Sequence, residues 1–210
     1  MTYKFQTPAI FLIGPTASGK TETSLRLAEE FPLEIISVDS AMVFKEMNIG
    51  TCKPSLQNLE NVPHHLIDIL QPDAEFDVGI FIRYVDSAIQ TIIQNKKIPL
   101  FVGGTMMFHK VLLDGIHDFP RDDSLREEID QIRRNKGYQL LLNELELLDP
   151  ETFQLIDKKN PRRVQRALEI IKLTKTKLSL LKKEPSKKFL NSENCFCLLY
   201  TSPSPRDRIR

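Results

Sequence analysis

The feature that most constrains this 210-residue chain is a glycine-rich loop near its N-terminus. Residues 14–21 have the spacing Gly-x-x-x-x-Gly-Lys-Thr, directly after an apolar run at Ala9–Ile13 and before a helical pattern of apolar residues. In that context such a loop wraps its backbone N–H groups around an anion at a helix N-terminus. Lys20 adds positive charge at the phosphate oxygens, and the Thr21 hydroxyl is placed to ligate Mg2+, which we expect as the cofactor. The sequence therefore predicts a phosphate-binding loop, or P-loop, formed by Gly14, Pro15, Thr16, Ala17, Ser18, Gly19, Lys20 and Thr21.

Short apolar runs alternate with longer amphipathic segments in the first half of the chain. The runs at Ala9–Ile13 and at residues 34–38, 66–69 and 99–102 are typical of buried parallel strands. Between the last two, apolar residues recur every three or four positions over residues 77–95, which predicts one amphipathic helix. The alternation predicts an α/β fold with a P-loop NTPase-like parallel sheet core and ligands at the carboxyl ends of its strands.

Beyond about residue 120 the patterns become helical, at residues 124–135, 138–148 and 161–173. Asn160 is a favourable N-cap for the last of these, and Pro161 suits its first helical position. The final residues combine Ser-Pro repeats with arginines, a composition typical of unstructured chain. We therefore expect a P-loop core at residues 1–118, a helical insertion subdomain at 119–197 and an unrelated or disordered tail at 198–210.

Composition limits the class of protein. No apolar run approaches the roughly 20 residues of a membrane span, and the N-terminus lacks the features of a signal peptide. The three cysteines and four histidines have no spacing typical of a disulfide framework or a zinc site. The net charge of +1 gives no general attraction to anions, although basic residues gather between residues 158 and 188. We expect a monomeric, cytoplasmic protein with no membrane contact.

Further short motifs follow the P-loop along the chain. They are Ile-Ser-Val-Asp-Ser at 36–40, Ile-Gly-Thr-Cys-Lys-Pro at 49–54, Pro-His-His-Leu-Ile-Asp at 63–68, Val-Gly-Gly-Thr at 102–105, Asp-Pro at 149–150 and Pro-Arg-Arg-Val-Gln-Arg-Ala-Leu-Glu at 161–169. In this order and spacing, over residues 9 to about 190, the chain resembles tRNA dimethylallyltransferases. The resemblance implies an enzyme that moves a dimethylallyl group from dimethylallyl diphosphate to N6 of an adenosine beside the tRNA anticodon. The P-loop would then hold diphosphate rather than ATP.

The resemblance also implies catalytic roles for two residues. Asp39 would accept the proton of the attacking N6, and it follows a predicted strand at the sheet edge where ligands lie. Thr105 would donate a hydrogen bond to the bridging oxygen of the departing diphosphate. Both have alternatives: Asp39 as a loop cap or an outer ligand of Mg2+, and Thr105 as the N-cap of the next helix.

Contacts with the tRNA anticodon stem-loop are implied for residues of both parts of the chain. They are Asp39, Ser40, Ala41, Met42, Thr105, Arg126, Arg162, Arg163, Val164, Gln165 and Arg166. The three arginines at 162, 163 and 166 begin one predicted helix, from which they can reach phosphates or stack on an unpaired base. A solvated helix face is the alternative for such a run of charges.

The chain departs from the family pattern near its end. From about Leu198 the sequence does not fit, so we expect a C-terminally truncated member of bacterial type with reduced or absent activity. The alternative function is a P-loop kinase that binds ATP and phosphorylates a small metabolite or nucleotide. In a kinase, the arginines of residues 162–166 would cover the transferred phosphoryl group.

Overall fold

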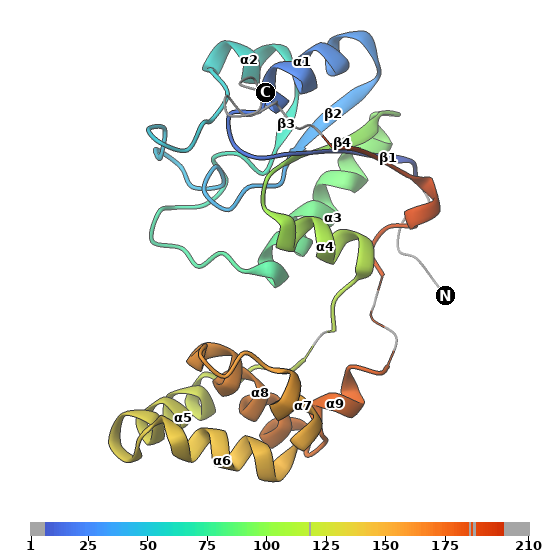
Figure 1. The fold of residues 1–210 in the computed structure, drawn as a ribbon. Coiled ribbons are helices and arrows are strands. Elements are labelled where there is room, and N and C mark those ends of the chain that lie inside the picture. The colour runs from blue at the N-terminus through green and yellow to red at the C-terminus, as the bar shows by residue number, and fades with distance from the viewer. Residues whose placement is uncertain (1–6, 118, 185, 187, 200–210) are drawn as a thin grey trace, which may run out of the picture. The chain divides into compact units, whose positions relative to one another are not determined.

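The computed structural model in Figure 1 describes residues 7–117, 119–184, 186 and 188–199. The chain divides into two compact units. The first extends to Gly115 and resumes at Lys188, and the second begins at Ile116 and occupies the stretch between. The predicted parts ended at residues 118 and 197, whereas the structure returns the chain to the first unit from Lys188 on.

A five-stranded parallel sheet forms the centre of the first unit. Its strands are β1 (Ala9–Ile13), β2 (Leu33–Ser37), β3 (His64–His65), β4 (Ile98–Gly103) and β5 (Cys195–Leu199), in the order β3-β2-β4-β1-β5. The register pairs Ile13 with Gly103 and Ser37 with Val102, so the carboxyl ends of β1, β2 and β4 meet at one edge. The predicted parallel α/β architecture is confirmed.

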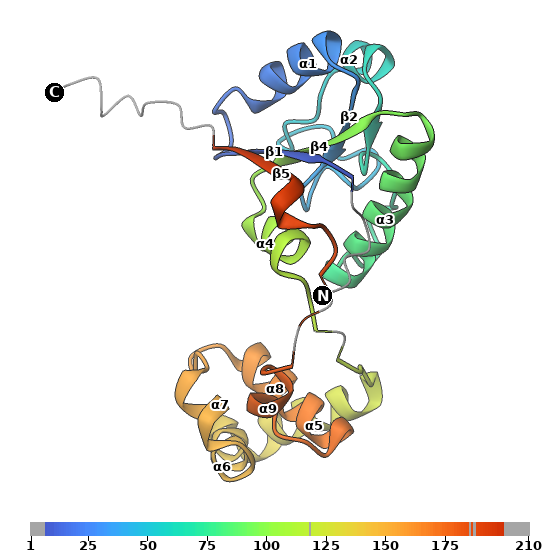
Figure 2. The same ribbon diagram turned by 90° about the vertical axis from the view of Figure 1, so that its right-hand side faces the viewer.

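Two strand predictions are corrected by this sheet. The strand expected at residues 66–69 lies instead at His64–His65, because Leu66 and Asp68 have left-handed φ angles of 63° and 53° that end the extended backbone. Strand β5 was not predicted, and it pairs in parallel with β1 at the edge of the sheet (Figure 2). It includes Leu198, which the sequence analysis placed in the tail. The rest of the predicted tail, from residue 200 on, lies outside the described residues.

Helices cover both faces of the sheet (Figures 1 and 2). On one face lie α3 (Val78–Gln94), which matches the helix predicted at 77–95 and is capped by Asp77, and α4 (Met106–Asp114). Buried phenylalanines fill this layer, and the rings of Phe81 and Phe108 stack with centroids 4.1 Å apart. Burial of each such ring stabilises the fold by roughly 2–3 kcal/mol. The other face packs against α1 (Lys20–Glu30) and the residue after α2 (Leu56–Asn61).

The second unit consists of helices around its own apolar core. They are α5 (Asp123–Lys136), α6 (Tyr138–Leu148), α7 (Pro150–Leu155), α8 (Pro161–Thr174) and α9 (Leu178–Leu181). The three predicted helices correspond to α5, α6 and α8, while α7 and α9 were not predicted. Asp149 is fully buried and its carboxylate accepts hydrogen bonds from the backbone of Thr152 and Ser179, which joins the starts of the two short helices. None of the helices in the described ranges has the length and apolar character needed to cross a membrane.

Candidate active site

The P-loop connects β1 to α1 at the carboxyl edge of the sheet. Ala17 and Gly19 have left-handed φ angles of 64° and 92°, which turn the backbone sharply before the helix begins. A left-handed alanine is strained by about 1–3 kcal/mol, a strain that is typical of ligand-binding loops. Because the first-turn N–H groups of a helix lack intrahelical partners, the N-terminus of α1 offers donors and a positive dipole to an anion.

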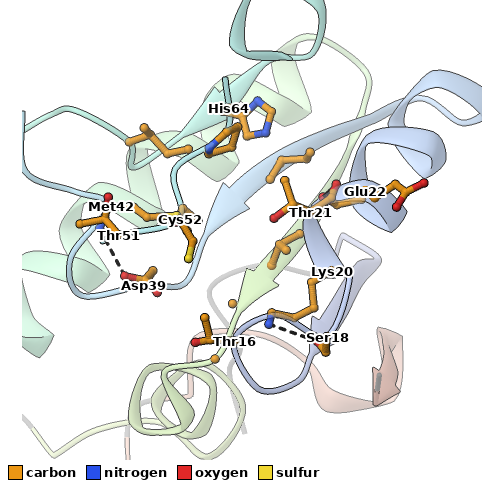
Figure 3. Close-up of a pocket in the computed structure, with 18 of the residues that line it drawn as sticks. Thr16, Ser18, Lys20, Thr21, Glu22, Asp39, Met42, Thr51, Cys52 and His64 are labelled. Carbon is orange, nitrogen blue, oxygen red and sulfur yellow. Dashed lines mark hydrogen bonds between the residues drawn. The ribbon is translucent and has the colours of Figure 1, made fainter. Parts of the chain in front are cut away.

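Lys20 lies folded against the same loop (Figure 3). Its ammonium donates to the carbonyl oxygen of Pro15 at 2.6 Å and to the Ser18 hydroxyl at 3.4 Å. Burial lowers the pKa of Lys20, and the nearby Asp39 and Cys52 offset part of that shift. A bound anion would favour the charged ammonium further. The Lys20 ammonium therefore lies beside the N-terminus of α1, where an anion would bind.

The P-loop forms one wall of a cavity of about 410 Å3. The other walls come from the ends of β2 and β4 and from the loop between β2 and α2. Its size falls within the usual range for small-molecule sites. Thr21 and Asp39 both line it, together with apolar side chains that include Met42 and Ile67. The cavity can hold an anionic group at the P-loop and an apolar group beside it.

Asp39 lies two residues after β2, across the cavity from Lys20 (Figure 3). Its Oδ1 accepts hydrogen bonds from the backbone N–H groups of Ala41 at 2.7 Å and Met42 at 3.2 Å. The loop-cap alternative therefore describes a real contact. The same contact fixes the carboxylate on the cavity wall, so the cap does not exclude a further role for Asp39 in the cavity.

Thr105 begins α4 directly after Gly103 and Gly104, which line the cavity. Its N–H donates to the carbonyl oxygen of Val38 at 3.3 Å, next to Asp39. Thr105 occupies the N-cap position, but within the described chain its hydroxyl makes no capping hydrogen bond. A side chain at Gly103 would meet the Val38 carbonyl oxygen at 2.1 Å, so only glycine allows β4 and the end of β2 to approach so closely.

An oxygen donor on the cavity wall fits a magnesium ion. The Thr21 hydroxyl is a hard ligand of the kind that Mg2+ prefers, and Mg2+ usually keeps waters and substrate phosphates as its other ligands. Among the residues with described positions, no group of three or more His, Cys, Asp or Glu forms a metal cluster. Any magnesium at this site would accordingly depend on a phosphate-bearing ligand for part of its coordination.

The predicted tRNA-contacting residues of the helical unit form two sets: the arginines that pair with Glu169, and the remaining residues of α8. Arg126 and Arg166 both pair with Glu169, each at 3.0 Å, and the side chain of Glu169 is fully buried. Burial alone would raise the pKa of Glu169, but hydrogen bonds from the Asp122 backbone and from both arginines lower it. Arg126 and Arg166 thus hold α5, α8 and the preceding segment together. The role of Glu169 was not predicted from the sequence, although its position three residues after Arg166 is a spacing at which helical side chains pair.

The rest of that set differs in exposure. The Val164 side chain is fully buried in the helical core, and Gln165 donates to the Arg126 carbonyl oxygen at 2.9 Å. Arg162 and Arg163 are exposed at the start of α8. Only these two of the α8 residues therefore present side chains chiefly to solvent.

Further cavity residues were not singled out from the sequence. Thr51, Cys52 and Pro54 line it, from a motif that the resemblance included without assigning a role. His64 also lines it; its Nδ1 lies 2.7 Å from the Val62 carbonyl oxygen, and burial lowers the pKa of the ring. His65 pairs with Glu34 at 2.8 Å.

The parallel sheet, the strand–loop–helix anion site and the adjacent cavity define a P-loop protein of the α/β class. The sequence model of the family described as IPP transferase matches residues 42–210, so the chain belongs to the IPP transferase family. The kinase alternative is not favoured by this match.

Solved structures of the same family are similar to the chain. A eukaryotic dimethylallyltransferase acting on tRNA is 30% identical with a TM-score of 0.82, over 96% of this chain and 50% of its own. The full-length tRNA isopentenylpyrophosphate transferase of Bacillus halodurans is 38% identical with a TM-score of 0.53, over 80% of this chain and 56% of its own. The tRNA delta(2)-isopentenylpyrophosphate transferase of Staphylococcus epidermidis is 33% identical with a TM-score of 0.50, over 88% of this chain and 62% of its own. The chain thus spans between half and two thirds of the length of these relatives.

Proposed function

We propose that this chain is a tRNA prenyltransferase that uses dimethylallyl diphosphate. The dimethylallyl group passes to N6 of an adenosine beside the tRNA anticodon, and diphosphate is released. The observation that carries the proposal is one cavity with a P-loop and Lys20 on one wall and the fixed carboxylate of Asp39 on another. The relatives support it, because one is named as a dimethylallyltransferase acting on tRNA.

The P-loop binds the diphosphate and stabilises its departure. As the bond between the allylic carbon and the bridging oxygen breaks, negative charge builds up on the diphosphate. The N–H groups at the start of α1 and the Lys20 ammonium neutralise that charge in place. The backbone N–H of Thr105 donates to the Val38 carbonyl oxygen, next to Asp39. Its hydroxyl donates to the bridging oxygen of the diphosphate.

The Thr21 hydroxyl would hold a magnesium ion in this cavity. A bound ion would supply further positive charge at the leaving group. This role agrees with the position of Thr21 on the cavity wall, at the start of α1.

Asp39 acts on the adenosine that accepts the dimethylallyl group. The bond from N6 to the allylic carbon forms while N6 loses a proton, and the carboxylate of Asp39 accepts it. The hydrogen bonds from Ala41 and Met42 keep the carboxylate in one orientation, which a general base requires. Ser40, Ala41 and Met42 form the turn beside the incoming nucleotide.

The helical unit contacts the tRNA through Arg162 and Arg163, whose exposed guanidinium groups suit phosphate binding. Arg126, Val164, Gln165 and Arg166 support that surface by packing and hydrogen bonding. We expect the protein to act as a monomer in the cytoplasm, where tRNA is available.

The test is transfer of label from isotopically labelled dimethylallyl diphosphate to unmodified tRNA, measured for the unaltered chain, Lys20→Met and Asp39→Asn. Lys110→Met, at an exposed position of α4, is the control. The proposal predicts measurable transfer, at the reduced rate that the sequence leads us to expect, by the unaltered chain and the control, and loss of transfer in both site variants. Absence of transfer by the unaltered chain, or phosphorylation of an acceptor from ATP, would refute it.

A further inference from the structure

The loop between β2 and α2 carries much of the cavity wall without regular structure of its own. Asp39 and Met42 come from its first half, and Thr51 and Cys52 from its second half. Apart from the isolated bridge between Phe44 and Leu70, the loop contains no strand or helix, and all of it is described. Its position must therefore be fixed by contacts with the rest of the unit.

Backbone hydrogen bonds hold the first half. The segment after β3 donates from Asp68 to Met42 at 3.1 Å and from Ile69 to Val43 at 2.9 Å, and Lys45 donates to Leu70 at 2.8 Å. The second half reverses direction through left-handed residues at Glu46, Gly50 and Cys52. It needs a separate attachment.

Lys53 supplies that attachment. Its ammonium donates to the Phe44 carbonyl oxygen at 2.6 Å, to Asn48 Oδ1 at 3.3 Å and to Asp68 Oδ1 at 2.6 Å. The Lys53 side chain is only 5% exposed. Because an ammonium has three donors, these three acceptors satisfy it, and a lysine this buried is tolerated only when it is so paired.

The three acceptors lie on different segments: the first half of the loop, its outer turn and the segment after β3. Lys53 itself does not line the cavity, but its chain neighbours Cys52 and Pro54 do. The ammonium thus joins the two halves of the loop to each other and to the segment after β3.

We infer that Lys53 is a positioning residue for prenyl transfer: through Asp68 and Phe44 it holds the loop so that the carboxylate of Asp39 faces the P-loop. This inference rests on the proposed function. The P-loop is built separately, from β1 and α1, so loss of Lys53 should disturb the acceptor side more than the diphosphate side. A misplacement of a reacting group by about 1 Å can lower a rate about 100-fold.

The experiment compares the unaltered chain with Lys53→Met and Asp68→Asn. The rate constant and KM for dimethylallyl diphosphate come from label transfer to tRNA, and the affinity for inorganic diphosphate comes from calorimetry. Lys97→Met is the matched control, because Lys97 also pairs with an acidic residue of this unit, Glu34 at 3.6 Å, but lies outside the cavity lining. Thermal unfolding verifies that each variant is folded. If Lys53→Met does not fold, Asp68→Asn takes its place, because it keeps an oxygen that can accept a hydrogen bond from Lys53.

The inference predicts that kcat falls about 10- to 100-fold in Lys53→Met and in Asp68→Asn. Diphosphate affinity should change by less than about threefold, and the control should match the unaltered chain. A folded Lys53→Met protein with unchanged kcat would overturn the inference alone, as would an equal loss of kcat and diphosphate affinity. Absence of transfer by the unaltered chain would overturn the proposed function and this inference with it.

Discussion

Replacement of Gly103 by alanine tests the close approach of β4 to the end of β2. The added Cβ would lie 2.1 Å from the oxygen and 2.5 Å from the carbon of the Val38 carbonyl group. These are backbone atoms, so no side-chain rotation can relieve the overlap, and the strand ends must separate by about 1 Å. Separation also strains the hydrogen bond from the Thr105 N–H to that oxygen.

The magnitude follows from these two effects. Forcing an extra carbon into a packed site is destabilising by about 1–3 kcal/mol, and loss of a hydrogen bond adds about 1 kcal/mol. Gly103→Ala should therefore lower the free energy of unfolding by about 2–4 kcal/mol. In a protein of this size the melting temperature would fall by roughly 5–15 °C. Because Val38 precedes Asp39, prenyl transfer at a permissive temperature should also fall, about 10-fold or more.

Thermal unfolding followed by circular dichroism measures the effect, with Gly79→Ala as the matched control. There the Cβ meets only Asp77 Oδ1, at 3.3 Å, in the first turn of α3. Alanine is the better helix former, so the control should melt at the wild-type temperature or a few degrees higher. If Gly103→Ala melted within about 2 °C of the wild type, the steric reasoning would be wrong.

Two further predictions concern the helical unit. Glu169→Gln should destabilise it by about 2–4 kcal/mol near neutral pH, because Arg126 and Arg166 lose a buried counter-charge. The pKa of Glu169 is lowered in the folded state, so its contribution is present above the unfolded pKa of about 4.5 and is lost as pH falls through the folded pKa. Denaturant unfolding should thus show the gap between wild type and variant narrowing below pH 4.5, and a gap constant with pH would contradict this account. Replacing Arg162 and Arg163 together by alanine should weaken tRNA binding and reduce its salt dependence by about two charges, with stability unchanged, and an unaltered salt dependence would exclude them as phosphate contacts.

Local patterns predicted most of the fold because they need no distant partner. The strand before the P-loop, the helix capped by Asp77 and the helix that begins at Pro161 all have their boundaries in their own sequence. Helices α7 and α9 have only six and four residues, too few for an apolar period to be recognised. Their starts depend on Asp149, which is buried by surrounding helices.

The strand errors have a non-local origin. Strand β5 is defined by pairing with β1 from the opposite end of the chain, which no pattern within Cys195–Leu199 reveals. The shift of β3 arises because the segment after His65 hydrogen-bonds to the loop at residues 42–45 instead of continuing along β2. Both arrangements are decided by tertiary contacts rather than by local preference.

The candidate site was predictable where a motif imposes a backbone shape. The glycine spacing and Thr21 predicted the P-loop, and Asp39 was placed correctly at the sheet edge. The function of a charged residue was harder to predict, because it depends on the partner. A run of arginines does not reveal that Arg166 is bound to a buried glutamate while Arg162 faces solvent.

The central claim is that Lys20 binds the diphosphate and Asp39 acts only on the adenosine. A calorimetric titration with inorganic diphosphate in the presence of Mg2+ tests this claim directly. Lys20→Met should weaken binding about 10- to 100-fold, since a charge-assisted hydrogen bond is lost. Asp39→Asn should bind diphosphate as tightly as the unaltered chain or more tightly, because a negative charge leaves the cavity. Unchanged affinity in Lys20→Met, or an equal loss in Asp39→Asn, would contradict the assignment of the P-loop to the leaving group and of Asp39 to the acceptor.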